Sequence, residues 1–228
     1  MDRFLLIVPV YNEISNLKKN LTKIYKEVKR LNGKLVVAED GSTDGSKEFI
    51  KRFARNHEIG YFLNEKRLGR GKAIKNVCSL KKAKIYGYID SDLAVGLKNI
   101  ERAVLLIENG YDIVVGSRYK SKKAKRSFKR LFLSKFYNFL VRILLKSKTS
   151  DHQCGFKFWN EKANKICKEV KDNHWFFDTE FLIRAQRKNL KIYEMGVDYK
   201  EQKKTKVRIL EIFYFLNRIL ELRKQLKV

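Results

Sequence analysis

The first half of the chain alternates short apolar runs with amphipathic stretches, and this alternation limits the possible folds more than any other feature. We expect five strands, at residues 4–10, 35–38, 60–63, 85–89 and 113–115. The stretches between them have apolar residues at helical spacing, and predict helices at residues 14–31, 46–57, 71–83 and 97–109. Such alternation is typical of βαβ units, so the prediction is an α/β fold with a mainly parallel sheet flanked by helices.

The second half differs in charge and periodicity. Residues 118–148 hold twelve basic residues and no acidic one, and apolar side chains recur at helical spacing between Leu131 and Leu144. Arg130, Ser134 and Asn138 are four apart and share one helix face. A helix is expected at residues 179–188 and a last amphipathic helix at 207–226. We therefore divide the chain into a domain of residues 1–206 and a C-terminal amphipathic helix, 207–228.

Net charge restricts the partners of the protein. The chain has 52 Lys and Arg against 25 Asp and Glu, a formal charge of +27. This excess predicts an anionic partner, namely nucleic acid, an anionic membrane or a phosphorylated substrate. We expect no signal peptide and no transmembrane helix, because no apolar run is long enough. Three cysteines and three dispersed histidines predict neither a disulfide framework nor a zinc site.

Asp90-Ser91-Asp92 directly follows an apolar run that we expect to be a buried strand. Alternation along a strand would point the two carboxylates to opposite sides, so the chain must turn at Ser91 for both to meet one ligand. The usual ligand of such a pair is a hard divalent cation, Mg²⁺ or Mn²⁺, shared with substrate phosphates. The alternative is that both residues only form a turn.

Three further motifs are the segments 9–13 and 39–45, which follow expected strands, and 68–73, which begins an expected helix. Glu39 and Asp40 open a turn rich in glycine, and either could accept hydrogen bonds from a nucleobase beside Tyr11. The segment 68–73 precedes a helix, and its backbone N–H groups with Arg70 and Lys72 suit an anion. The alternatives are a plain turn at Pro9, a tight strand-to-helix connection for 39–45 and a solvated helix start for 68–73. Ligands of parallel sheets bind beyond the carboxyl ends of the strands, where the segments 9–13, 39–45 and 90–92 fall.

Taken in order, the segments 8–13, 39–45, 68–73, 90–94 and 116–118 resemble the family 2 glycosyltransferases with a GT-A nucleotide-sugar-binding fold. The segments 151–157, 175–180 and 205–208 narrow this resemblance to the dolichyl-phosphate sugar synthases. Leu93-Ala94 after the acidic pair is similar to the dolichyl-phosphate glucose synthase branch, whereas the mannose branch usually has Gln at the position of Ala94. The resemblance covers nearly residues 1–210.

The resemblance implies inverting transfer of a sugar, glucose from UDP-glucose on the branch similarity, to dolichyl or polyprenyl phosphate. It implies a metal and diphosphate site at Asp90, Ser91 and Asp92. Catalysis is expected to depend on Asp90, Asp92, Arg118 and Arg130. The nucleotide and diphosphate positions are Pro9, Tyr11, Glu13, Glu39, Asp40, Lys72, Lys200 and Lys206, and the acceptor-phosphate positions are Arg118, Arg130, Ser134 and Asp151.

A phosphate acceptor is already anionic near neutral pH, so it needs positioning more than deprotonation. Asp178 and Glu180 could orient the sugar or the basic residues, or could only cap the helix near Thr179. The chain departs from the family pattern at His152, where Thr is common, and at Lys200, where the mannose branch has Arg.

The amphipathic stretches 128–145 and 213–222 are expected to lie in an anionic membrane interface, on its cytoplasmic face. The alternative is that their apolar residues pack the core, and an oligomer or a membrane-anchored partner is a further possibility. Other enzyme alternatives are GDP-mannose as the donor or a different acceptor. The non-enzyme alternative is a nucleic-acid-binding protein, which the net charge would suit, but nucleic acid is not expected, since long aliphatic stripes interrupt the basic block.

Overall fold

A seven-stranded sheet forms the centre of the protein, for which a computed structural model describes residues 2–121, 128–200 and 209–227. The strand order is β3-β2-β1-β4-β6-β5-β7. All neighbouring pairs are parallel except those made by β6, which runs antiparallel to β4 and β5. The strands are β1 (Asp2–Val10), β2 (Lys34–Asp40), β3 (Gly60–Asn64), β4 (Ala83–Ile89), β5 (Ile113–Ser117), β6 (Phe156–Asn160) and β7 (Ile192–Gly196).

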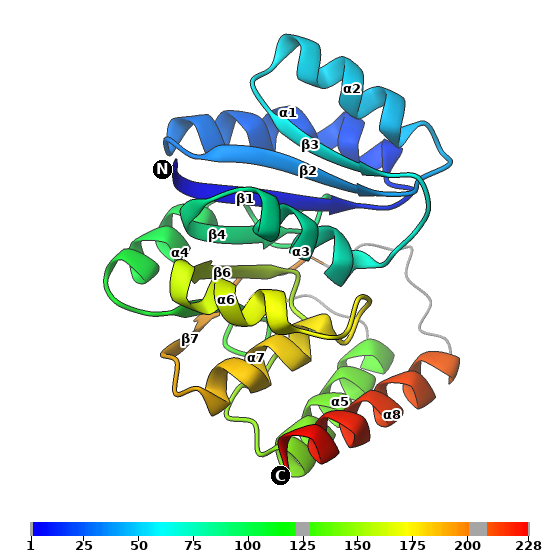
Figure 1. Ribbon diagram of the computed structural model, residues 1–228, viewed down its shortest axis with the longest axis vertical. Coiled ribbons are helices and arrows are strands. Elements are labelled where there is room, and N and C mark those ends of the chain that lie inside the picture. Colours follow the sequence, from blue (N-terminus) through cyan, green and yellow to red (C-terminus); the bar gives the residue numbers. More distant parts are fainter. Residues whose placement is uncertain (1, 122–127, 201–208, 228) are drawn as a thin grey trace.

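Helices cover both faces of this sheet (Figure 1). One face packs against α1 (Ile14–Arg30), α2 (Ser46–Asn56) and α4 (Asn99–Glu108). The other face packs against α3 (Arg70–Leu80), α6 (Glu161–Glu169) and α7 (Phe177–Arg187). The predicted α/β fold class, with a mainly parallel sheet between helices, is therefore confirmed.

The sequence of β1 shows why the sheet is buried on both sides. Phe4, Leu6 and Val8 enter the core beneath α1 and α4, whereas Leu5 and Ile7 enter the core beneath α3 and α7. Successive side chains of a strand point to opposite faces, so a continuous apolar run suits a strand with helices on both sides.

The two remaining helices, α5 (Phe128–Leu145) and α8 (Ile209–Leu226), lie side by side at the end of the molecule away from α2 (Figure 1). Their inner faces pack with α7 in a separate apolar cluster that contains Val141, Ile183 and Ile219. Within the described residues, no helix combines the length and the apolar character needed to cross a bilayer.

Strand β6 was not predicted, and neither were α6 and β7. Strand β6 inserts between β4 and β5 with Gly87 opposite Phe158, a pairing between residues 71 positions apart. Hydrophobic periodicity indicates which face of a segment is buried but not which distant strand it pairs with. The antiparallel insertion of β6 therefore depends on tertiary contacts. Helix α7 begins at Phe177 rather than at Thr179. The boundary at 206/207 lies outside the described residues.

Gly87 leaves room for the ring of Phe158, because a Cβ at this position would lie 2.4 Å from that ring. We expect Gly87→Ala to lower the free energy of unfolding by about 1–3 kcal/mol through overpacking. Gly96→Ala is the matched control, since its Cβ would meet its nearest neighbour at 4.0 Å. Urea unfolding of both variants checks this expectation, and equal stabilities would contradict the close packing of β4 on β6.

Candidate functional site

The predicted motifs meet at one edge of the sheet, beyond the carboxyl ends of β1, β2 and β4. Because β6 is antiparallel, its amino end lies at the same edge, and the backbone N–H of Asp90 donates to the carbonyl of Gly155, 3.2 Å away. The loop that precedes β6 therefore joins the site from the second half of the chain. This edge is where open parallel sheets bind their ligands.

Asp90 and Asp92 lie in a tight turn that follows β4. The N–H of Leu93 donates to the carbonyl of Asp90 at 3.2 Å, and Leu93 has a positive φ of 52°. Asn20 of α1 fixes the turn by donating to the carbonyl of Ser91 at 2.9 Å. The chain thus turns at Ser91, as the sequence required for the two carboxylates to serve one ligand.

A glycine makes room for one oxygen of this acidic pair. A Cβ on Gly155 would lie 1.7 Å from Oδ2 of Asp90, so the carboxylate occupies the space that any other residue would fill. The other oxygen, Oδ1, is 3.1 Å from Nη2 of Arg70. Asp92 accepts a hydrogen bond from the N–H of Ala94 at 2.9 Å.

Glu13 adds a third carboxylate beside the pair. Burial raises the pKa of Asp90, which Arg70 opposes and Asp92 reinforces. Burial also raises the pKa of Asp92. The hydrogen bond from the N–H of Ala94 lowers this pKa, and the charge of Glu13 raises it further. The pKa of Glu13 is raised by burial, while Asn16 lowers it and Asp90 raises it further. Crowded carboxylates of this kind suit a divalent cation, which relieves their mutual repulsion.

The donor set fits such an ion only in part. Within the described residues, no group of three His, Cys, Asp or Glu side chains is arranged to hold a metal by itself. Two aspartates therefore leave coordination positions for oxygens of a bound substrate, which is the usual arrangement for Mg²⁺ beside phosphates.

Glu39 and Asp40, at the end of β2, have different surroundings. The carboxylate of Asp40 accepts from the N–H groups of Leu68 and Gly69, both at 2.8 Å, and from Asn64 at 3.0 Å. Asp40 thus holds the segment that leads into α3. Glu39 accepts from the N–H of Ser42, but its Oε2 is buried without a hydrogen-bond partner among the described residues.

An aromatic ring and a cation lie beside these carboxylates. Tyr11 is 36% exposed, and the guanidinium of Arg67 is 4.0 Å from the centre of its ring. Pro9 pairs with Ala38 within the sheet and is partly buried. Arg67 was missed by the sequence reasoning, since no local pattern distinguishes it from the other exposed cations of the chain.

Arg70, rather than Lys72, is the cation of the glycine-rich segment that reaches the acidic pair. Its Nη1 is 3.6 Å from Asp178, and its side chain is only 12% exposed. Among the described residues, neither Nε nor Nη2 of Arg70 makes a hydrogen bond of acceptable geometry. Lys72 is half-buried, and its backbone N–H is occupied by the carbonyl of Asn173 at 3.0 Å. The sequence signalled both cations, but only the fold distinguishes them.

Behind Arg70 lies a buried ion pair between Lys157 of β6 and Asp178 of α7, 2.9 Å apart. Tyr88 donates to Asp178, and Lys157 donates to Tyr88 at 3.1 Å. Asp178 therefore orients basic side chains, one of the two alternatives left open by the sequence. Glu180 accepts from the N–H groups of Lys171 and Asp172 and so shapes the loop before α7.

Arg118 follows β5 and binds Asp151 through two hydrogen bonds, of 2.8 and 2.6 Å. Burial would raise the pKa of Asp151, but the charge and hydrogen bonds of Arg118 hold it below its ordinary value. Glu194 of β7 accepts from the N–H of Asp151 at 3.2 Å. The guanidinium of Arg118 is thus held in place by a carboxylate.

The remaining predicted residues are placed unequally. Ser134 lies on α5 and shares a hydrogen bond of 2.5 Å with Tyr119. The backbone of Lys200 donates to Ala94 at 2.9 Å, which brings this residue beside the acidic turn. Arg130 belongs to α5, but its side chain, like the whole of Lys206, lies outside the described residues.

Comparisons with known proteins identify the family. Residues 5–166 match the model described as Glycosyl transferase family 2. The chain is 34% identical over 213 residues to the glycosyltransferase AglD of Haloferax volcanii, covering 90% of this chain and 34% of that protein. It is 31% identical over 218 residues to the dolichyl-phosphate beta-glucosyltransferase ALG5A of Trichomonas vaginalis, covering 90% of this chain and 68% of that protein. The chain therefore spans about a third of AglD and about two thirds of ALG5A.

Solved structures share the fold at low sequence identity. Glucosyl-3-phosphoglycerate synthase from Mycobacterium tuberculosis, in complex with Mn²⁺, UDP-glucose and phosphoglyceric acid, has a TM-score of 0.65 at 15% identity, over 97% of this chain and 78% of that one. The TarS fragment 1–349 from S. aureus, in complex with UDP-GlcNAc, has a TM-score of 0.62 at 14% identity, over 96% and 66% of the two chains.

His152 predicts an acid sensitivity of the folded protein. It is fully buried, shares hydrogen bonds of 2.7 Å with both Asn138 and Ser147, and burial lowers its pKa to about 3. The unfolded chain takes up this proton near pH 6.5 and the folded chain only near pH 3. As the pH falls between these values, protonation of this residue in the unfolded chain should therefore lower the free energy of unfolding by about 1.4 kcal/mol for each pH unit.

We expect His152→Thr to remove this slope, so that wild type loses about 2 kcal/mol more than the variant between pH 7 and pH 5. Urea unfolding at both pH values measures the difference. Parallel pH profiles for the two proteins would contradict a neutral, buried His152.

Proposed function

The chain belongs to glycosyl transferase family 2, and we propose that it is an inverting enzyme that transfers glucose from UDP-glucose to dolichyl or polyprenyl phosphate. One observation carries the proposal above all. The acidic turn Asp90–Asp92 lies next to Glu13, beyond the carboxyl ends of the strands. Gly155 has no side chain that would overlap Oδ2 of Asp90. The name of the ALG5A relative supports glucose as the transferred sugar and dolichyl phosphate as the acceptor.

The donor nucleotide is proposed to lie over the ends of β1 and β2. The Oε2 of Glu39 accepts no hydrogen bond among the described residues and lies 4.0 Å from Nζ of Lys47, so it is available to an N–H of the base, and the ring of Tyr11 offers a flat surface beside it. Pro9 and Asp40 act indirectly, since Pro9 is paired within the sheet and Asp40 holds the segment that carries Arg67 and Arg70.

Asp90 and Asp92 are proposed to hold Mg²⁺ or Mn²⁺, with Glu13 and Ser91 beside them. The metal would supply positive charge that stabilises the leaving nucleoside diphosphate. Arg70 contacts Asp90 from the start of α3, and the backbone of Lys200 is bonded to Ala94 beside the acidic turn. Lys72, in the same segment as Arg70, is also proposed for the diphosphate. Lys206 completes the set of basic residues proposed for the diphosphate.

The acceptor phosphate is proposed to bind at Arg118, Arg130 and Ser134. Asp151 fixes Arg118 with a two-point hydrogen bond, which orients the guanidinium before the substrate arrives. A phosphate monoester is already charged near neutral pH, so its oxygen can attack the sugar without a general base. Positioning and charge then account for the catalysis required of the protein.

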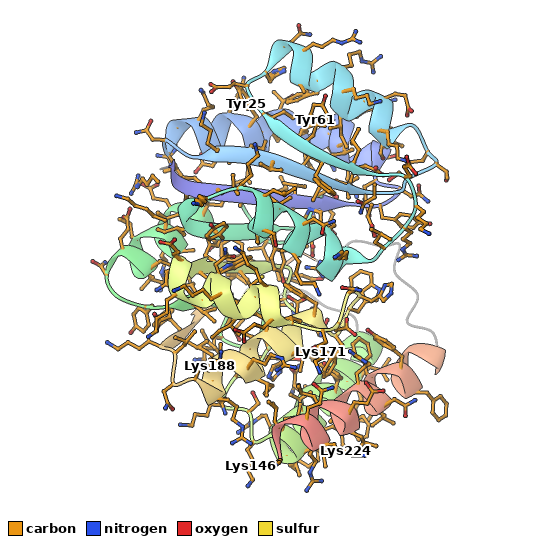
Figure 2. All side chains as sticks on the ribbon, in the orientation of Figure 1. Tyr25, Tyr61, Lys146, Lys171, Lys188 and Lys224 are labelled. Carbon is orange, nitrogen blue, oxygen red and sulfur yellow. The ribbon has the colours of Figure 1, made fainter. Side chains whose placement is uncertain are left out.

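An apolar stripe supports delivery of this acceptor from a membrane. Phe132, Phe136, Phe139 and Ile143 form one face of α5 and are 48–64% exposed, and Phe213 and Leu220 on α8 are 62% and 53% exposed. Both helices have basic residues at their carboxyl ends: Lys146 comes directly after α5, and Lys224 lies in the last turn of α8 (Figure 2). An apolar face edged by cations suits the interface of an anionic membrane.

Two alternatives share the same fold. A GDP-mannose donor, or an acceptor other than polyprenyl phosphate, would use the same acidic turn. Thermal shifts with UDP-glucose, UDP-N-acetylglucosamine and GDP-mannose distinguish the donors, and we expect UDP-glucose with Mn²⁺ to stabilise the protein most. Preferential stabilisation by GDP-mannose would replace the glucose assignment.

Loss of a metal-binding carboxylate should abolish turnover. We expect Asp92→Ala to lower transfer of labelled glucose to dolichyl phosphate on the order of 100-fold or more. Glu58→Ala is the control, because Glu58 lies on the surface and pairs only with Lys29 and Lys34 among the described residues. Near-normal turnover by Asp92→Ala would contradict the metal assignment.

Membrane binding should depend on the exposed stripe of α5. We expect Phe136→Ser/Phe139→Ser to weaken binding to vesicles of phosphatidylcholine and phosphatidylserine by about tenfold or more, since two aromatic side chains no longer leave water. Tyr61→Ser is the control, because Tyr61 is 47% exposed on β3 at the other end of the molecule (Figure 2). Vesicle flotation measures both, and equal losses would contradict this orientation.

A further inference from the structure

Arg70 lies between two carboxylates that belong to different parts of the fold. Its Nη2 is 3.1 Å from Asp90, on the acidic turn, and its Nη1 is 3.6 Å from Asp178, on α7. Building on the proposed function, we propose that Arg70 is a positioning residue that competes with the divalent cation for Asp90. It holds Asp90 in the metal-free enzyme and pairs with Asp178 when the metal is bound.

The first argument is the charge of the acidic turn. Asp90, Asp92 and Glu13 repel one another, and Arg70 is the cation in contact with Oδ1 of Asp90. A divalent cation that binds this oxygen would face a guanidinium a few ångströms away, and like charges at that separation repel strongly. Metal binding at Asp90 therefore requires Arg70 to withdraw.

The second argument is that Arg70 has a place to withdraw to. Asp178 is 1% exposed and is held rigidly by Lys157 and Tyr88. The rings of Tyr88 and Trp175 lie 4.9 and 5.5 Å from the guanidinium carbon, so the head can shift between the two carboxylates while it stays against aromatic faces. The shift costs little, because Asp178 is already within ion-pair reach.

The third argument is the unused hydrogen-bonding capacity of Arg70. Its buried Nε makes no hydrogen bond among the described residues, and its Nη2 lies 3.1 Å from Oδ1 of Asp90 without the geometry of a hydrogen bond, although a guanidinium has five N–H donors. Unmade hydrogen bonds of a buried charged group are costly, so they mark a position that a ligand completes. Oxygens of the donor diphosphate, next to the metal, are the ligand chemistry that these donors suit.

The test is the affinity for Mn²⁺ in the absence of nucleotide, measured by isothermal titration calorimetry. We expect Arg70→Gln to bind Mn²⁺ about threefold or more tighter than wild type, because the competing charge is gone. Arg55→Gln, the same substitution on the exposed surface of α2, should leave the affinity unchanged. Equal or weaker binding by Arg70→Gln overturns the inference.

Asp178→Asn tests the second position. We expect it to weaken Mn²⁺ binding in the wild-type background, because Arg70 then stays on Asp90, and to have no effect in the Arg70→Gln background. An equal loss in both backgrounds would show that Asp178 acts independently of Arg70 and would overturn the shared-cation arrangement. Circular dichroism first establishes that Asp178→Asn folds, and Arg70→Gln alone decides the inference where it does not.

The proposed function fails in a different way. If wild type and Arg70→Gln bind no Mn²⁺, with or without UDP, the metal assignment falls and the inference with it. If both bind Mn²⁺ with equal affinity, the metal assignment stands and only the role of Arg70 is overturned.

Discussion

The buried ion pair between Lys157 and Asp178 is the interaction on which the rest of the site depends. Both side chains are almost fully withdrawn from water, so each charge must be compensated within the protein. Lys157 achieves this by donating to the carbonyls of His152 and Cys154, each at 2.9 Å, and thereby shapes the loop that brings Gly155 beneath the acidic turn. Asp178 in turn leaves one oxygen toward Arg70. One desolvated pair thus links β6, α7 and the start of α3.

Opposite charges alternate across the site, which explains how a chain of such high positive charge maintains a concentrated acidic turn. Arg118 is neutralised by Asp151 and Arg70 is shared by Asp90 and Asp178. The buried cations are therefore fixed by carboxylates, whereas most of the excess lysines lie on the surface. Because salt screens exposed charges far more than buried ones, the pairing of the buried charges governs the electrostatics of the site.

The C-terminal helix is connected to the same network. Asp172 accepts from Tyr214 of α8 at 2.6 Å and pairs with Arg218 at 3.0 Å, while its other oxygen accepts from the N–H groups of His174 and Phe177. The loop after Asp172 contacts the first turn of α3, which carries Arg70. The helices with the exposed apolar stripe are thus connected, through Asp172 and the loop that follows it, to the side of the site proposed for the donor diphosphate.

The sequence by itself determined the α/β alternation, the strand ends at which Asp40 and Asp90 lie, the turn at Ser91 and the two amphipathic helices, because hydrophobic period and turn chemistry are local properties. Tertiary structure alone decided the antiparallel insertion of β6, the choice of Arg70 over Lys72 beside Asp90, and the pairing of Arg118 with Asp151. Each of these depends on contacts between residues far apart in the chain. The energy of a buried charge is set by whichever partner the fold brings within reach, and no local pattern carries that information.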